Sequence, residues 1–284
     1  MAAPPPAQPS PQSPQPRRSG SRRRRNRIKR ALLLLGAAGS GIAGAAAIGL
    51  IWWSWKVPPT IDQATLCAQD APLAIHAVLV DRSDPLSADQ QEKVREVLDR
   101  AVLEAAVGER VALYVSETDH VETLRPMLAL CNPGTAPSEN YPDARVQRER
   151  YEREFRPRLR VVAEDLGRRP NRNNAPVMES IRAVCIDAFR DAPEGSTLRM
   201  SIIGDMTQYS LLGNHHVDRN YDAYLSGRRL DAMQADCKGA QTDIYYVRRP
   251  TTASIPGPQG VAHLRFWELF LERIKARQRN VQDV

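Results

Sequence analysis

Two aspartates and a serine stand directly after two apolar segments of this sequence. Asp81 and Ser83 follow the run LAIHAVLV at residues 73–80, and Asp205 follows the run TLRMSIIG at residues 197–204. Carboxylate and hydroxyl oxygens are the ligands that a hard divalent cation such as Mg²⁺ prefers. If the two segments are strands that end at the same edge of a sheet, Asp81, Ser83 and Asp205 form one candidate metal site.

The segments that carry these residues are predicted to be strands of an α/β sheet. Residues 73–80 form a near-continuous apolar run with β-branched side chains, which is typical of a strand buried on both faces. The other predicted strands are residues 110–116, 125–130, 197–204 and 243–247. Because helices alternate with these strands, we expect a doubly wound, mostly parallel sheet flanked by helices, with ligand sites at the carboxyl ends of the strands.

The helices between the strands have recognisable boundaries. Ser87 and Gln90 form a capping-box pattern ahead of apolar residues at helical spacing, and Gly108 ends that helix. A long charged helix is predicted at residues 143–166, and Pro157 should kink or interrupt it. The other predicted helices are residues 177–189, 222–235 and 260–277.

The order of these elements, with Asp81, Ser83 and Asp205, resembles the von Willebrand factor A-like (vWA) family over about residues 73–276. In that family an apolar strand ends in Asp-x-Ser-x-Ser, a Thr comes from a later loop, and a further Asp follows the central strand. The resemblance implies a metal-ion-dependent adhesion site, which usually binds an acidic residue of a protein partner. Asp81 and Ser83 match the first two positions, and Asp205 matches the last.

Two of the five ligand positions of that family site differ in this sequence. Pro85 stands where the second Ser is expected, and Ala175 or Asn174 stands where the Thr is expected. The resemblance is therefore to a divergent bacterial, membrane-anchored member with a degenerate site, and Mg²⁺ is the only cofactor it implies. The alternative for Asp81 and Asp205 is a structural role, in which they accept backbone N–H bonds from the turns that follow.

The N-terminal part of the sequence predicts a membrane anchor. Residues 1–30 hold nine basic and no acidic residues, and the 25 residues from 31 to 55 are uncharged and mostly apolar, with Trp52, Trp53 and Trp55 at the far end. Such a segment is long enough to cross a hydrocarbon core of ~30 Å, and tryptophan prefers the membrane interface. A cleavable signal peptide is the alternative.

The positive-inside rule then orders the chain across an inner (plasma) membrane. We expect a disordered, Pro-rich and Arg-rich cytoplasmic tail at 1–30, a transmembrane helix at 31–55, a stalk at 56–72 and a vWA-like domain at 73–284, on the periplasmic or extracellular side. Small residues spaced four apart in the apolar segment are compatible with a homodimer through this helix.

The charge distribution excludes a basic nucleic-acid-binding domain. The chain has 40 Lys and Arg against 33 Asp and Glu, but nine of the basic residues lie in 1–30, which leaves 31 basic and 33 acidic residues after residue 55. A nucleic-acid-binding domain carries its positive charge on the folded face. We therefore expect no nucleic-acid partner.

The four cysteines, Cys67, Cys131, Cys185 and Cys237, all follow the predicted membrane segment. The sequence has no Cys-x-x-Cys, so a structural zinc site is not expected. An even number of cysteines outside the cytoplasm favours disulfides, with three pairings open. The alternative is four separate buried thiols.

Together these features predict an interaction protein at a bacterial envelope and not an enzyme. The sequence has no Gly-x-Ser-x-Gly, no phosphate-binding Gly loop and no His-Glu-x-x-His. The predicted contact surface combines the metal site with the loops 132–141 and 208–221, and its partner-binding residues are Asp84, Tyr209 and Tyr221. The alternatives are a divalent-metal-dependent hydrolase and an inert structural anchor of an envelope complex.

The histidines give weaker signals. His215 and His216, with Asp218 nearby, are interpreted as a polar loop in preference to a transition-metal site, because adjacent side chains point in different directions. His76 lies inside the first predicted strand and is expected to be a core histidine with its polar atoms satisfied.

Overall fold

The computed structural model describes residues 46–50, 60–68, 73–116, 121–138, 143–166, 174–250 and 257–284. The chain divides into two compact units, Met1–Val57 and Pro58–Val284. In the first unit, residues 46–50 are helical. Within the described ranges, no helix has both the length and the apolar character that crossing a membrane requires. The predicted tail at 1–30 and most of the predicted transmembrane helix at 31–55 lie outside these ranges.

The second unit is built on a six-stranded sheet with the order β3-β2-β1-β4-β7-β8. All neighbouring strands run parallel except β3, which pairs antiparallel with β2. The strands of this sheet are β1 (Ala74–Asp81), β2 (Arg110–Ser116), β3 (Leu128–Cys131), β4 (Thr197–Gly204), β7 (Gln241–Tyr246) and β8 (Arg277–Asp283). The predicted doubly wound, mostly parallel α/β sheet is confirmed.

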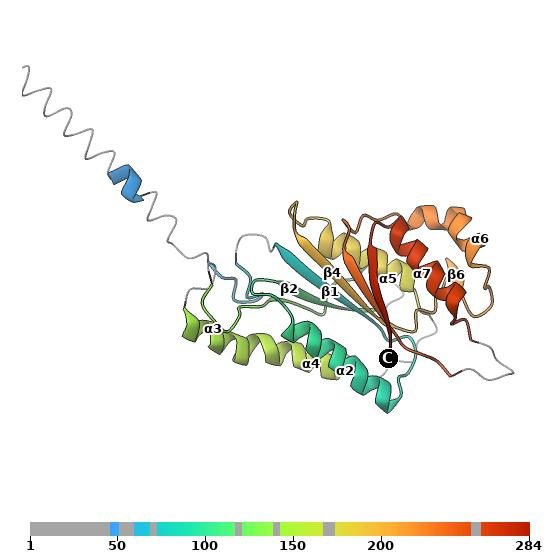
Figure 1. Cartoon of the computed structure of the whole chain (residues 1–284), viewed down its shortest axis with the longest axis horizontal. Helices are drawn as coiled ribbons and strands as arrows, with labels where there is room; N and C mark the ends of the chain where they lie inside the picture. Colours follow the sequence, from blue (N-terminus) through green and yellow to red (C-terminus); the bar gives the residue numbers. More distant parts are fainter. Residues whose placement is uncertain are drawn as a thin grey trace, which may run out of the picture. The chain divides into compact units, whose positions relative to one another are not determined.

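Helices cover both faces of the sheet, so the domain has three layers (Figure 1). One face carries α2 and α4, and the opposite face carries α5 and α7. The helices of the domain are α2 (Ala88–Leu103), α3 (Ala144–Arg150), α4 (Arg156–Leu166), α5 (Val177–Val184), α6 (Tyr221–Ser226) and α7 (Val261–Arg273), with short 3₁₀ turns at Val121–Thr123 and Arg228–Met233.

The pleat of β1 explains why this strand is apolar at nearly every position. Its side chains alternate between the two cores: Ala77 and Leu79 pack toward α5 and α7, whereas Val78 and Val80 pack toward α2 and α4. A strand that is covered on both faces has no polar side. The apolar run therefore marks β1 as the centre of the three layers.

Several predicted helices are interrupted. The segment 143–166 contains a π-helical turn at Tyr151–Phe155, directly ahead of Pro157, and residues 177–189 end in a second π-helical turn at Cys185–Phe189. Pro157 lacks an N–H and would clash with the carbonyl one turn earlier in a regular α-helix, which accounts for the first interruption. The turn at Cys185–Phe189 contains no proline. The predicted helix 222–235 is broken at Gly227 into α6 and a 3₁₀ turn.

Two strand elements escape sequence prediction. The predicted helix 260–277 ends at Arg273, and β8 follows as an edge strand of mostly exposed polar residues, RQRNVQD. Such a strand carries no apolar alternation. A short hairpin, β5 (Tyr209–Ser210) and β6 (Gly213–Asn214), lies within the predicted loop 208–221.

The domain contains two disulfides, which correspond to one of the three possible cysteine pairings. Cys67 bonds to Cys131 at the end of β3, and Cys185 bonds to Cys237 ahead of β7. The first bond fixes residues 60–68, which were predicted as stalk, onto the domain, and Leu66 is fully buried there. The compact unit thus begins before residue 73, at Pro58.

Candidate functional site

The carboxyl ends of β1 and β4 bring Asp81 and Asp205 to the same edge of the sheet. The two strands are adjacent and parallel, with Val80 opposite Ile203. Gly204 separates the aspartates, and a Cβ atom placed on it would lie 2.7 Å from Asp81 Cβ. Asp81 can therefore occupy this position only because residue 204 has no side chain.

Asp81 is buried, and its two carboxyl oxygens have different surroundings. Oδ1 accepts a hydrogen bond from the backbone N–H of Ser83 at 3.0 Å. Oδ2 is buried and has no hydrogen-bond partner in the structure. Burial, followed by the charge of Asp205, raises the pKa of Asp81 to about 7. The carboxyl group of Asp81 therefore holds its proton to a higher pH than an exposed aspartate does.

Asp205 is also buried, with only 2% of its side chain exposed. Its Oδ1 accepts a hydrogen bond from the backbone N–H of Thr207 at 2.8 Å, which is the structural turn role considered for this residue. Its Oδ2 accepts from Nε of Arg249 at 2.7 Å. Both carboxylate oxygens of Asp205 thus have partners within the protein.

Arg249 comes from the segment after β7, which reaches the same edge of the sheet. Its Nη1 donates to the carbonyl of Pro85 at 2.6 Å, so one guanidinium joins the loops after β1 and β4. Gln259 holds this segment in place: its Oε1 accepts from the Arg249 N–H at 2.8 Å, and its Nε2 donates to the carbonyls of Val247 and Asp205. Sequence reasoning missed Arg249, although it follows a predicted strand as Asp81 does.

Asp84, predicted to bind a partner, belongs to the same charged group. Burial, then the charge of Asp205 and a side-chain hydrogen bond with it, raises the pKa of Asp84, whereas Arg249 lowers it. Asp81, Asp84, Asp205 and Arg249 therefore lie close enough to influence one another electrostatically, and we call them the carboxyl-edge cluster.

The donor set of this cluster does not fit a divalent cation. Magnesium needs near-octahedral oxygen ligands and is repelled by a neighbouring positive charge. Here Arg249 binds Oδ2 of Asp205, and the carbonyl of Pro85 accepts a hydrogen bond from Arg249. Ala175, at the family's Thr position, offers no side-chain oxygen and pairs through its backbone with Tyr209. Within the described ranges, no three His, Cys, Asp or Glu side chains are arranged to hold a metal ion.

The remaining predicted partner-binding residues differ in exposure. Tyr209 is 41% exposed and stands on the hairpin. Tyr221 is only 7% exposed and donates its hydroxyl to the carbonyl of Pro258, so it belongs to the core and not to a contact surface. Its position at the start of α6 turns its ring inward against His215 and Phe266.

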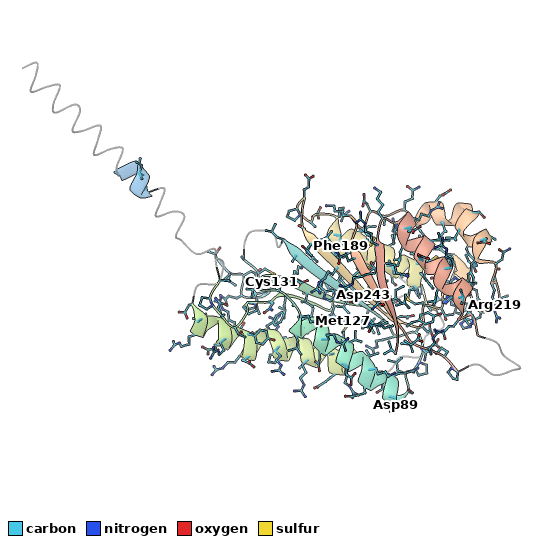
Figure 2. The ribbon with its side chains drawn as sticks, viewed as in Figure 1. Asp89, Met127, Cys131, Phe189, Arg219 and Asp243 are labelled. Carbon is cyan, nitrogen blue, oxygen red and sulfur yellow. A yellow bond between two sulfur atoms is a disulfide. The ribbon has the colours of Figure 1, made fainter. Side chains whose placement is uncertain are left out.

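One of the two predicted contact loops lies elsewhere. Because β3 runs antiparallel to β2, Cys131 pairs with Arg110 at the start of β2, and the segment that follows begins at the amino edge of the sheet. Figure 2 shows Cys131 and Arg219, a residue of the other loop, at opposite ends of the domain. Residues 132–138 therefore cannot share a face with the carboxyl-edge cluster, and residues 139–141 lie outside the described ranges.

The hairpin beside the cluster carries an exposed apolar surface within the predicted contact loop 208–221, and Tyr209 is the one residue of it that the sequence analysis named. Leu211 is fully exposed at its tip, and the ring of Tyr209 meets the ring of the exposed His216 edge to face. We call Tyr209, Leu211 and His216 the hairpin surface. Ser210 donates to Glu179 at 2.5 Å, and Gln208 donates to the same carboxylate at 2.9 Å, so α5 holds the hairpin in place.

A pocket of about 590 Å³ adjoins the hairpin surface. Leu211 and Leu212 form one wall, and Pro176 and Met233 contribute further apolar surface. Glu179 and Arg182 of α5 supply its charges. An apolar hollow with a few charged groups beside an exposed leucine suits a side chain of a binding partner.

The two histidines of the predicted polar loop separate in the structure. His216 is exposed, whereas His215 is buried against His263, with 3.1 Å between His215 Nδ1 and His263 Nε2. Trp267 and Tyr246 also bond to His263. Burial lowers the pKa of His215 to about 3 and that of His263 to about 4. This pair is therefore neutral and structural.

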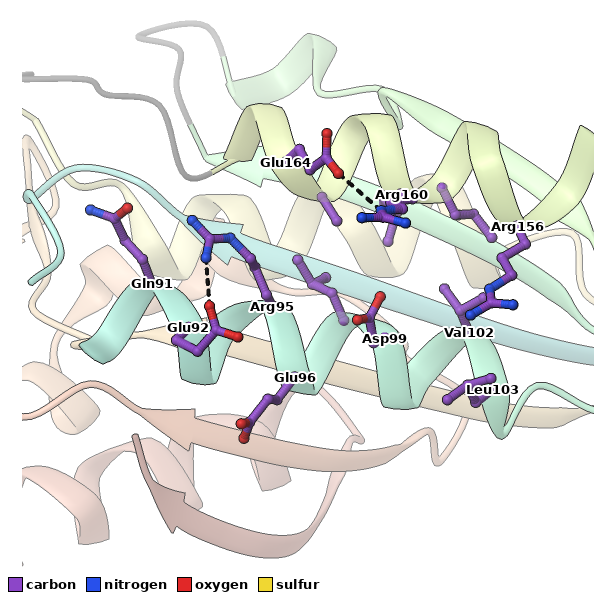
Figure 3. A pocket seen from close by; sticks show the side chains of 14 residues that line it. Gln91, Glu92, Arg95, Glu96, Asp99, Val102, Leu103, Arg156, Arg160 and Glu164 are labelled. Carbon is purple, nitrogen blue, oxygen red and sulfur yellow. Dashed lines mark hydrogen bonds and ion pairs between the residues drawn. The ribbon is translucent and has the colours of Figure 1, made fainter. Parts of the chain in front are cut away.

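A larger groove, of about 690 Å³, lies between α2 and α4 (Figure 3). Charged residues line it and pair within their own helices: Arg95 with Glu92 at 2.6 Å, and Arg160 with Glu164 at 2.9 Å. Such exposed pairs one helical turn apart are ordinary solvated contacts. The groove brings together none of the residues predicted to do chemistry.

The sheet order, the antiparallel β3 and the helices on both faces agree with the vWA-like fold that the sequence resemblance implies. Among solved structures, the crystal structure of the SpRpn10 VWA domain matches with 9% sequence identity and a TM-score of 0.39, over 74% of this chain and 87% of that chain. No protein-family model and no curated protein matches the sequence. The comparison thus concerns the fold alone.

Proposed function

We propose that this chain is a membrane-anchored interaction protein whose vWA-like domain binds a protein partner through the hairpin surface. The domain stands on the non-cytoplasmic side of a bacterial inner membrane, and residues 31–55 hold it there. This role is non-enzymatic and needs no nucleic acid. A homodimer through the membrane segment is compatible with it.

The hairpin surface is the observation that carries this proposal. Leu211 is fully exposed on the hairpin, and it lines a pocket of about 590 Å³ together with Leu212, Pro176 and Met233. Apolar surface that is gathered in one patch in this way marks an interaction site. Tyrosine is enriched at protein interfaces, because its ring buries area while its hydroxyl still finds a partner. An inert anchor would have no need of such a surface.

The two disulfides support the proposed compartment. Cys67–Cys131 and Cys185–Cys237 use every cysteine of the sequence. Disulfides persist in the periplasm and outside cells, and are rare in the cytoplasm. The basic residues of 1–30 ahead of an apolar segment favour the same topology by the positive-inside rule.

A photocrosslinking amino acid at position 211 tests the binding surface. Leu103 on α2 is the matched control, because it is also apolar and 64% exposed but lies in the helical layer on the other face of the sheet. In native membranes we expect a discrete adduct from position 211 and none of the same mass from position 103. Equal adducts from both positions, or none from position 211, would contradict the proposal.

Protease protection tests the topology separately. In spheroplasts, the proposal predicts that an added protease cleaves the domain while a cytoplasmic control protein stays intact. Protection of residues 58–284 until the membrane is lysed would place the domain in the cytoplasm and refute the proposed side.

Mg²⁺ is not part of this proposal, because Arg249 and Pro85 make the donor set unsuitable. Magnesium binding at Asp81, Ser83 and Asp205 stays a prediction from the family resemblance. The hydrolase alternative depends on the same cation, so it is disfavoured by the same contacts. Titration of the wild-type chain with Mg²⁺ tests both.

A further inference from the structure

The carboxyl-edge cluster already contains a cation. Arg249 reaches Asp205 Oδ2 with Nε at 2.7 Å and the Pro85 carbonyl with Nη1 at 2.6 Å. Pro85 occupies the position where the vWA-like site would carry its second serine ligand. The guanidinium thus bonds to one acidic ligand of that site and to the backbone at another ligand position.

We propose that Arg249 is the permanent cation of this site and occupies the place that a divalent metal takes in a complete adhesion site. The domain then keeps the metal-site architecture but not the metal, and the face at the carboxyl ends of β1 and β4 stays in one state whatever the metal concentration. Partner binding through the neighbouring hairpin surface would be insensitive to chelators.

Burial makes this ion pair more than a surface contact. The side chain of Arg249 is 23% exposed and that of Asp205 is 2% exposed. A guanidinium has a fixed planar fork that bonds two acceptors at once, whereas Mg²⁺ requires oxygens on all sides. A metal ion could approach Asp205 only by displacing Arg249 and leaving that charge half-buried.

The segment that carries Arg249 is fixed independently of the ion pair. Gln259 bonds to its backbone N–H and to the carbonyls of Val247 and Asp205, and Gln90 at the start of α2 donates to the carbonyl of Arg248 at 2.8 Å. These bonds hold the backbone of Arg248 and Arg249 beside the cluster, and they do not depend on the ion pair between Arg249 and Asp205. An arginine held by its neighbours in this way is preorganised as a permanent ligand of Asp205.

The preceding residue, Arg248, provides a matched control. It also bonds to an aspartate, Asp283 at 2.8 Å, but 47% of its side chain and 60% of the Asp283 side chain are exposed. The two arginines are neighbours in the segment after β7, and they differ in burial and in the site they face. Arg248 also stacks over the ring of Tyr246, with 4.8 Å from its guanidinium carbon to the ring centroid, so Arg248→Met removes that contact as well.

The test compares the wild-type full chain in detergent with Arg249→Met and Arg248→Met, by thermal unfolding in EDTA, Mg²⁺ and Mn²⁺. We expect a wild-type Tm that is the same in all three, and a larger loss of Tm for Arg249→Met than for Arg248→Met. Arg249→Lys keeps the charge and should recover part of the loss. It also remains informative if Arg249→Met does not fold.

Two results would overturn the inference. One is a rise of the wild-type Tm with Mg²⁺ or Mn²⁺ that Asp205→Asn abolishes, because the metal would then bind with Arg249 present. The other is an equal loss of Tm for Arg249→Met and Arg248→Met. Neither result bears on crosslinking from position 211, so this inference and the proposed function can fail separately.

Discussion

Two neighbouring regions at the carboxyl edge of the sheet differ in which side chains they bury and which they expose. The carboxyl-edge cluster buries its charged residues and pairs Asp205 with Arg249, whereas the hairpin surface exposes Leu211 and Tyr209. Charged residues at strand ends are usually the first candidates for function. Here both carboxylate oxygens of Asp205 have partners inside the protein, and the hairpin surface is the part that exposes apolar side chains.

The largest expected effect comes from breaking the cluster at Asp205. Asp205→Ala leaves Arg249 partly buried without its carboxylate, and removing one partner of a buried pair typically costs about 3–5 kcal/mol. Asp283→Ala, which removes the exposed partner of Arg248, should cost less than about 1 kcal/mol. Urea unfolding of the two variants measures the difference. Similar losses would mean that the two ion pairs are equivalent.

A second change tests the close approach of the two strands in the cluster. Gly204→Ala places a Cβ atom 2.7 Å from Asp81 Cβ, and overpacking of this kind costs about 1–3 kcal/mol. Gly260→Ala is the control, because no atom lies within 4 Å of its added Cβ. If Gly204→Ala unfolds at the same urea concentration as the control variant, the described contact is absent.

The free energy of unfolding should depend on pH in opposite directions for His76 in the core and Asp81 in the cluster. Burial, then Arg199 and Arg279, lowers the pKa of His76 to about 3. In the unfolded chain that pKa is about 6.5, so between these values the unfolded state binds a proton that the folded state does not. The contribution of His76 to stability should therefore fall by about 1.4 kcal/mol per pH unit as the pH drops below about 6.5.

Replacing His76 isolates this contribution. Asp81, whose pKa is raised to about 7, acts in the opposite direction, because its stabilising effect is lost as the pH rises toward neutrality. That effect is common to the wild type and to His76→Gln and cancels in their difference. The variant should show a shallower acid loss between pH 4 and 6 on unfolding curves. Parallel curves would show that His76 titrates normally.

The smallest effect on stability is expected at the hairpin surface. Leu211→Asp changes a fully exposed side chain, so the free energy of unfolding should stay within about 0.5 kcal/mol of wild type. The same change should abolish partner binding, because a charge replaces the exposed apolar contact. Partner binding is measured by coimmunoprecipitation of wild type and Leu211→Asp with the partner that crosslinking from position 211 identifies. Retained binding would remove Leu211 from the contact.

Much of the fold follows from the sequence because the central strands are covered on both faces. The run at β1 has no regular polar alternation, and Ser87 forms the capping box with Gln90 that the pattern predicts. The edge strand β8 could not be found in this way, since its residues are polar and mostly exposed. Its pairing with β7 depends on position in the sheet and not on its own composition.

The candidate site was predictable only in part. Asp81 and Asp205 follow buried parallel strands, so their shared edge is readable from the sequence. The partner of Asp205 is not, because Arg249 approaches through a turn whose path depends on Gln259. Tyr221 illustrates the same limit: an aromatic residue in a polar segment gives no sign of which way its ring faces.

The most direct test of this account is the crosslink yield from position 211 in native membranes, measured in EDTA and in excess Mg²⁺. Binding through an apolar hairpin beside a cluster that has its own cation predicts equal yields of the same adduct under both conditions. An adduct that disappears in EDTA and returns with Mg²⁺ would show that a divalent metal completes the binding face, and would contradict the account.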